Sequence, residues 1–337
     1  MNATSPLPPQ PAPQLLALDW GTSRLRAYLM AAGAVVAERE SAHGIQHLPQ
    51  PGAAGYAAAL AGIAGDWLAR WPDLPLLACG MVGSAQGWRE APYVRCPADV
   101  AALAAQAVPV ETAHARPLWI VPGMLDAAPG RMPDVMRGEE TQIAGALDRD
   151  TADARRGFIL PGTHSKWATV EAGRLLRFST YLTGELYAVL RTHSILGRLM
   201  PAGEAPCADD AFARGVAAGG DGALTHQLFS VRTLALTGEL APEALPDYLS
   251  GLLIGHELSQ ELGSQQRQKP GQKLAAAGGE GEAEAPPAGY TLIGDPTLCA
   301  RYARAFVLLG ETAPPVLANS APRGLWRIAE ARGLVPS

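Results

Sequence analysis

The chain opens on short apolar runs separated by glycine turns, a pattern typical of a strand meander. Residues 15–18 are apolar at every position, and apolar and polar residues then alternate through residues 24–30. An unbroken apolar run predicts a strand buried on both faces, whereas alternation predicts one buried face. A turn at Gly33 leads into a third apolar run at 35–37, and helical spacing follows at 56–71. We therefore predict three consecutive strands followed by a helix.

The same succession returns in the middle of the chain. Residues 158–160 form an apolar run, 166–170 follow a turn at 161–165, and 175–178 follow a turn at Gly173. Helical spacing comes next, at 185–200. Two matching units that open two halves of the chain predict a two-lobed α/β protein.

Each copy contains a glycine-threonine turn between its first two strands, Asp-Trp-Gly-Thr-Ser at 19–23 and Pro-Gly-Thr-His-Ser at 161–165. Such turns present backbone N–H groups and hydroxyls that can bind phosphate oxygens. One such turn is usually only a turn. Two in matching contexts favour a polyphosphate ligand held by both lobes.

The remaining segments suggest how the chain is organised. Strands are predicted at 76–79 and 290–293, and helices at 298–309 and 321–332. Residues 264–289 are rich in Gly, Pro, Glu and Gln and lack apolar periodicity, which indicates a surface insertion. We expect a disordered Pro-rich tail at 1–14, an N-terminal lobe at 15–155, a C-terminal lobe at 156–319, and a C-terminal helix at 320–337.

Composition and charge narrow the function classes. The chain carries 27 Lys and Arg against 32 Asp and Glu, for a net charge of −5. Without a basic stripe, nucleic-acid binding is not expected. No apolar run is long enough to span a membrane, and no signal peptide is evident. The 4 cysteines are far apart in the sequence, which favours reduced thiols over a disulfide framework. A cytoplasmic location is therefore expected.

Several common site motifs are absent. The chain has no Walker phosphate loop, no dinucleotide-binding glycine motif and no serine-hydrolase elbow. His256 and Glu257 begin like a zinc-binding helix, but Gln260 stands where the second histidine is needed. We therefore interpret Glu257 as an ordinary helical residue.

Two motifs resemble the phosphate-binding segments shared by sugar kinases, hexokinase, actin and Hsp70-type ATPases, namely Asp19-x-Gly-Thr-Ser and the segment 160–166. Longer strings at 80–88, 91–93, 135–142, 161–167, 183–186 and 249–255 resemble the 2-dehydro-3-deoxygalactonokinase family. The resemblance implies an actin-like ATPase fold: two ribonuclease H-like lobes with mixed sheets flanked by helices and a cleft between them. It also implies ATP-dependent phosphorylation of the 6-hydroxyl of 2-dehydro-3-deoxy-D-galactonate, with Mg²⁺.

The resemblance also suggests where the nucleotide binds. Asp19, at the end of the first strand, is expected to hold Mg²⁺ through water, because Mg²⁺ dehydrates reluctantly; the alternative is a carboxylate that caps the turn. The resemblance implies that the adenine side lies at Gly294 and Asp295, and that the helix at 320–337 returns to the N-terminal lobe. The expected phosphate-binding residues are Gly21, Thr22, Ser23, Gly162, Thr163 and Lys166.

The sugar hydroxyl needs a carboxylate that takes its proton or orients it. Glu139 and Glu140 are adjacent at a helix start and should point in different directions. Glu140 matches the connecting-segment acid of hexokinase-like kinases, so it is the expected base; alternatively both only cap the helix. Arg137 is expected to bind the substrate carboxylate. The other predicted substrate-binding residues are Ser84, Gln86, Trp88, Tyr93 and Glu185.

Two alternatives stay open. The chain could phosphorylate a related keto-deoxy sugar acid, or it could be a non-catalytic, nucleotide-gated binding protein of the same fold. ATP and a small sugar acid are the expected partners in the first reading. A homodimer is compatible with the sequence, and neither nucleic acid nor a membrane is expected.

Overall fold

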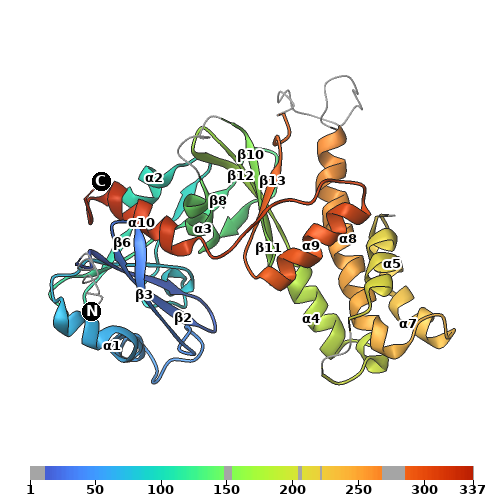
Figure 1. The fold of residues 1–337 in the computed structure, drawn as a ribbon, viewed down its shortest axis with the longest axis horizontal. Coiled ribbons are helices and arrows are strands. Elements are labelled where there is room, and N and C mark those ends of the chain that lie inside the picture. Colours follow the sequence, from blue (N-terminus) through green and yellow to red (C-terminus); the bar gives the residue numbers. More distant parts are fainter. Residues whose placement is uncertain (1–11, 148–153, 204–206, 221, 268–284, 337) are drawn as a thin grey trace, which may run out of the picture. The chain divides into compact units, whose positions relative to one another are not determined.

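The computed structural model describes residues 12–147, 154–203, 207–220, 222–267 and 285–336. Residues 1–11 of the predicted tail and 268–284 of the predicted insertion lie outside these ranges. The described start of that insertion, residues 264–267, is helical. The chain divides into two compact units (Figure 1). The first comprises Met1–Ala152, Gly173–Leu176 and Asn319–Ser337; the second comprises Asp153–Ala172 and Arg177–Ala318.

The first unit is built on a sheet of order β3-β2-β1-β4-β7-β6. Strand β1 pairs antiparallel with β2 and parallel with β4. A smaller sheet has the order β5-β8-β9. The strands are β1 Leu15–Trp20, β2 Leu25–Ala31, β3 Ala34–Ser41, β4 Leu76–Cys79, β5 Tyr93–Arg95, β6 Val108–Val110, β7 Leu118–Ile120, β8 Gly123–Asp126 and β9 Asp134–Met136. The α-helices are α1 Ala53–Arg70, α2 Val100–Ala105, α3 Glu139–Ala146 and α10 Ala321–Arg332.

Successive side chains of β1 point to opposite faces of the sheet, and those on one face pack against α1. Leu16, Leu18 and Trp20 pack in one cluster with Leu60 and Ile63 of α1. α10 packs against α2, α3 and β1 (Figure 1). α3 and α10 approach closely at glycines: a Cβ on Gly145 would lie 2.0 Å from the Ser320 carbonyl oxygen. This crossing holds α3, and the glutamates at its start, in place.

The second unit repeats the topology of the first. Its sheet has the order β12-β11-β10-β13-β14, and β10 pairs antiparallel with β11 and parallel with β13. The strands are β10 Arg156–Leu160, β11 Ser165–Glu171, β12 Arg174–Tyr181, β13 Tyr290–Ile293 and β14 Val316–Leu317. The α-helices are α4 Thr183–His193, α5 Asp209–Gly219, α6 Leu224–Leu228, α7 Ser230–Leu236, α8 Leu245–Arg267 and α9 Pro296–Leu308. The predicted class, two ribonuclease H-like lobes with mixed sheets, is confirmed.

One predicted helix, at 185–200, is shorter than expected. α4 ends at His193, and a short 3₁₀ turn follows at Gly197–Leu199. The Ser194 hydroxyl donates to the Leu190 carbonyl, 2.5 Å away, and accepts from the Leu196 N–H. A side chain that satisfies backbone groups in this way competes with the helical ladder and ends it. No helix in the described ranges is long and apolar enough to cross a membrane.

Candidate active site

Three segments of the first unit meet where β1 and β4 end. Asp19 and Cys79 are register partners in this parallel pair. The next residue, Gly80, has a φ of +90°, and a Cβ there would lie 2.8 Å from the Trp20 carbonyl oxygen and 3.6 Å from Asp19 Oδ1. A Cβ on Gly138, just before α3, would lie 3.3 Å from the Gly80 Cα. Glycine is therefore needed where Asp19 and the start of α3 come together.

Asp19 is a carboxylate with only loose partners, and one of them is the Cys79 thiol, which donates to its Oδ1 over 4.0 Å. Arg26 Nη1 lies 3.8 Å from its Oδ2, while the same guanidinium donates to Glu40 at 3.1 Å. Burial raises the pKa of Asp19, and the positive charge of Arg26 opposes that rise. The described residues contain no group of three or more potential metal-ligating side chains. A magnesium ion at Asp19 would therefore keep most of its ligands as water and substrate phosphate, which fits its preferred coordination.

The two glutamates at the start of α3 differ in burial. Glu140 is 2% exposed; it accepts from the Gly138 N–H at 2.7 Å and from the Thr141 hydroxyl at 3.0 Å. Glu139 accepts from the Arg137 N–H at 3.0 Å. Burial, and secondly the charge of Glu139, raise the pKa of Glu140 to about 8. Both carboxylates thus cap backbone groups at the helix start, and Glu140 is the one poised to exchange a proton near neutral pH.

Arg137 has hydrogen-bonding capacity to spare. Its Nη2 donates to the Ala91 carbonyl at 2.7 Å, and its guanidinium carbon lies 4.5 Å from the centre of the Tyr93 ring. Its buried Nε and Nη1 find no partner among the described residues, and neither does the buried Ser84 hydroxyl. A Cβ on Gly83 would lie 3.0 Å from Nη1. Buried donors without acceptors are costly and rare in native proteins, so this arrangement suits an anionic ligand.

Gln86 and Trp88 line a pocket of about 510 Å³ in the same unit. Neither Ser84 nor Arg137 lines this pocket. Tyr56 stacks on Trp88, with ring centres 5.6 Å apart, and donates to the Gln86 carbonyl at 2.9 Å. The aromatic contact and the hydrogen bond hold this loop in place. The sequence-predicted substrate residues of the loop therefore do not gather around one cavity.

The first glycine-threonine turn is held by its neighbours. The Gly21 N–H donates to the Arg24 carbonyl at 2.9 Å and is used inside the turn. The Gly21 and Thr22 carbonyls accept from the N–H groups of Ile45 and Gln46. A Cβ on Gly44 would lie 2.4 Å from the Ser23 carbonyl carbon. The adjacent loop thus presses directly on the turn and fixes its shape.

The second turn packs against the start of α4. A Cβ on Gly184 would lie 2.4 Å from the Gly162 carbonyl oxygen, and the Glu185 N–H donates to the Thr163 carbonyl at 3.0 Å. The Glu185 carboxylate lies 2.5 Å from His164 Nε2. Glu185, expected to bind the sugar acid, therefore pairs with the phosphate-type turn of its own unit.

Lys166 does not lie exposed at the end of this turn, as a phosphate-binding cation would. It is 5% exposed, and its ammonium group donates to the Thr180 hydroxyl of β12 at 2.8 Å. Successive residues of β11 are buried on both faces, so both side-chain directions lead into the protein.

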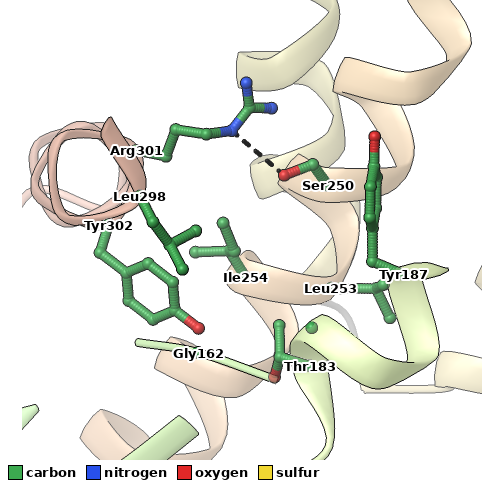
Figure 2. A pocket seen from close by; sticks show the side chains of 10 residues that line it. Gly162, Thr183, Tyr187, Ser250, Leu253, Ile254, Leu298, Arg301 and Tyr302 are labelled. Carbon is green, nitrogen blue, oxygen red and sulfur yellow. Dashed lines mark hydrogen bonds between the residues drawn. The ribbon is translucent and has the colours of Figure 1, made fainter. Parts of the chain in front are cut away.

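A pocket of about 220 Å³ opens beside Gly162 in the second unit. Figure 2 shows Arg301 of α9 reaching toward Ser250 of α8. Tyr302 of α9 lies lower in the view, and Thr183 of α4 lies at the bottom. The Arg301 Nε donates to the Ser250 hydroxyl at 3.2 Å. The full lining is Gly162, Thr183, Gly184, Tyr187, Ser250, Leu253, Ile254, Leu298, Arg301 and Tyr302.

Gly294 and Asp295, the sequence-predicted adenine-side residues, lie next to the second turn but outside this lining. A Cβ on Gly294 would lie 3.7 Å from the Pro161 carbonyl oxygen, and Asp295 caps α9 by accepting from the Leu298 N–H at 2.9 Å. The walls supplied by α8 and α9 were not predicted from the sequence. Their signal was one-turn spacing, with Ser250 followed by residues 253 and 254, and residue 298 followed by 301 and 302.

The chain is similar to one known protein family along most of its length. The model of the 2-keto-3-deoxy-galactonokinase family matches residues 19–328. The chain is 33% identical to the 2-dehydro-3-deoxygalactonokinase of Escherichia coli (strain K12), over 94% of this chain and 97% of that protein. A probable 2-dehydro-3-deoxygalactonokinase of Rhizobium meliloti (strain 1021) is 38% identical over 73% of this chain and 79% of that protein.

A crystal structure of a Sinorhizobium meliloti protein proposed to have this activity superposes with a TM-score of 0.78 and 32% identity, covering 94% of this chain and 98% of that chain. The matched residues include Asp19, both glycine-threonine turns and the start of α3. By sequence and by fold, then, this chain belongs to the 2-keto-3-deoxy-galactonokinase family.

Proposed function

We propose that the protein transfers the γ-phosphoryl group of ATP to the 6-hydroxyl of 2-dehydro-3-deoxy-D-galactonate. The hydroxyl oxygen attacks the γ-phosphorus, the bond to the β–γ bridging oxygen breaks, and ADP leaves. Family membership supports the kinase activity. The observation that carries the choice of an anionic sugar acid is the pair of unpartnered guanidinium nitrogens on Arg137, in the unit that holds Asp19 and Glu140.

Within this proposal, Arg137 donates to the substrate carboxylate from one of its unpartnered nitrogens, Nε or Nη1, and Ser84 donates or accepts one further hydrogen bond. A guanidinium is always charged, so its hydrogen bond to a carboxylate oxygen is charge-assisted and strong. The Nη2 bond to Ala91 and the Tyr93 ring already hold the side chain, so little conformational entropy is lost when the anion binds.

Glu140 accepts the proton of the 6-hydroxyl in this mechanism. Its carboxylate must be ionised to act as a base, and its pKa of about 8 makes it a stronger base than an exposed glutamate. Asp19 would hold Mg²⁺ through water, and the ion would neutralise charge on the phosphate oxygens. Mg²⁺ and the homodimer remain predictions.

The pocket beside Gly162 is the proposed nucleoside site. Its walls are largely apolar, with a few polar groups at Ser250, Thr183 and Arg301, which is the usual make-up of a small-molecule site. It adjoins the turn 161–165, so a nucleoside seated there would direct its phosphates toward the backbone N–H groups of that turn.

The four cysteines are free thiols, in keeping with the proposed cytoplasmic location.

A coupled assay of ADP formation tests the function. We expect turnover with 2-dehydro-3-deoxy-D-galactonate and Mg²⁺, and little with a neutral sugar. Arg137→Leu should raise the KM for the sugar acid about ten- to a hundredfold, as expected for a lost charged hydrogen bond, with the KM for ATP unchanged. Arg89→Leu removes an exposed cation from the neighbouring loop and is the matched control.

The outcomes separate the alternatives. Faster turnover of another keto-deoxy acid would assign a related substrate. ADP affinity without turnover of any keto-deoxy acid would favour the non-catalytic binding protein. An unchanged KM for the sugar acid in Arg137→Leu would remove the basis for an anionic substrate at this position.

A further inference from the structure

One buried carboxylate lies behind the wall of the pocket without lining it. Glu257, on α8, is 1% exposed. Its Oε1 accepts from the Trp167 indole N–H at 2.7 Å, and its Oε2 accepts from the Tyr302 hydroxyl at 2.7 Å and from the Thr183 hydroxyl. Among the described residues it forms no ion pair with a cation. The sequence-based interpretation of Glu257 as an ordinary helical residue is therefore wrong.

The three donors come from segments that build the nucleotide side of the protein. Thr183 begins α4 and lines the pocket, and Tyr302 lines it from α9. Trp167 lies in β11, which starts at Ser165 as the turn 161–165 ends. The Ser165 hydroxyl lies 2.8 Å from that of Tyr302. One acceptor on α8 thus connects the phosphate-type turn with two walls of the pocket.

Hydrophobic packing alone would not place a carboxylate here. Burial is the largest influence on this group and raises the pKa of Glu257 to about 7, while the bonds from Thr183, Trp167 and Tyr302 oppose the rise. Removing a charge from water without a countercharge is costly, and an apolar residue of similar volume is often more stabilising. A carboxylate instead fixes orientation, because its hydrogen bonds require the Trp167, Thr183 and Tyr302 donors to point at its two oxygens.

We propose that Glu257 is a positioning residue for the nucleotide, which holds the turn 161–165 at a fixed distance from the pocket walls at Thr183 and Tyr302. The proposal rests on the proposed function only in taking this pocket as the nucleoside site. Glu257 does not touch the nucleotide. Its effect passes through the side chains that it orients, so its loss should weaken nucleotide binding and leave sugar-acid binding intact.

Three variants test this role: Glu257→Ala, Glu257→Gln and, as a matched control, Glu261→Gln. Glu261 lies one turn further along α8 and accepts from the Tyr181 hydroxyl at 3.0 Å, away from the pocket lining. The measurements are the ADP dissociation constant by calorimetry, the KM for ATP, the KM for the sugar acid, and the melting temperature.

Glu257→Ala leaves three buried donors without their acceptor, and we expect ADP affinity and the KM for ATP to worsen about tenfold or more. The KM for the sugar acid should stay within about twofold. Glu257→Gln should recover part of the loss, because its amide oxygen still accepts from Trp167 while the two hydroxyls can accept from its amide nitrogen. Glu261→Gln should match the unaltered protein in both constants.

An ADP affinity unchanged in Glu257→Ala, with only a lower melting temperature, would overturn the proposal and make Glu257 a structural core group. Should that variant not fold, Ser165→Ala decides, because it deletes one small hydroxyl of the same network; unchanged nucleotide constants there would also overturn it. ADP binding needs no phosphoryl transfer. A protein that binds ADP but phosphorylates no keto-deoxy acid therefore refutes the proposed function and leaves this inference open to the same test.

Discussion

Replacing Glu140 with glutamine should remove a pH-dependent loss of stability. The pKa of this carboxyl rises from 4.5 in the unfolded chain to about 8 in the folded protein, chiefly through burial. A raised carboxyl pKa means that the folded state binds more protons than the unfolded state between these two values. The free energy of unfolding must therefore fall as pH increases through this window, and at about 1.4 kcal/mol per pH unit the full loss is about 5 kcal/mol.

Denaturant unfolding of the two proteins, from about pH 5 to about pH 9, measures this loss directly. The unaltered protein should become progressively less stable relative to Glu140→Gln, which has no charge to bury. The difference between the two curves isolates this residue, because other groups that titrate in the window, such as Glu257, are common to both. Parallel curves, differing by a constant amount, would refute the account of Glu140 as a buried acid.

The same substitution tests catalysis. Loss of a general base typically reduces kcat about a hundred- to ten-thousandfold, and in the unaltered protein kcat/KM should rise with pH as Glu140 ionises. Glu139→Gln is the control, because it changes the adjacent carboxylate, which accepts from the Arg137 N–H. If Glu139→Gln abolishes turnover while Glu140→Gln keeps it, the base is assigned to the wrong glutamate.

Two further predictions concern the metal and the second turn. Asp19→Asn keeps the side-chain size but removes the charge. The Mg²⁺ concentration needed for half-maximal turnover should rise about ten- to a hundredfold, as for ligands that act through water. An unchanged Mg²⁺ titration would make Asp19 only a cap of the turn. Gly184→Ala would place a Cβ 2.4 Å from the Gly162 carbonyl oxygen and should raise the KM for ATP. Gly62→Ala, in α1 with open space around it, is the control, expected to be neutral or slightly stabilising.

Most elements, and the repeat of one lobe in the other, could be predicted from the sequence. The strands at 76–79 and 290–293 and the helix at 321–332 have the bounds that their patterns predicted. These features are readable because strand alternation and glycine turns are local: each residue is interpreted from neighbours a few positions away. The family resemblance could be found for the same reason, because it rests on short strings of neighbouring residues around Asp19, Arg137 and the second turn.

Which of these groups are buried, and what they touch, depends on contacts between segments that are distant in the chain. Residue spacing could not show that Lys166 turns inward to Thr180, or that α8 and α9 form the pocket walls. Trp167 and Glu257 are 90 positions apart in the chain, and no periodicity relates them. Whether a carboxylate is an exposed charge or the acceptor at the centre of a network depends on what folds over it, and that is settled by packing between distant segments.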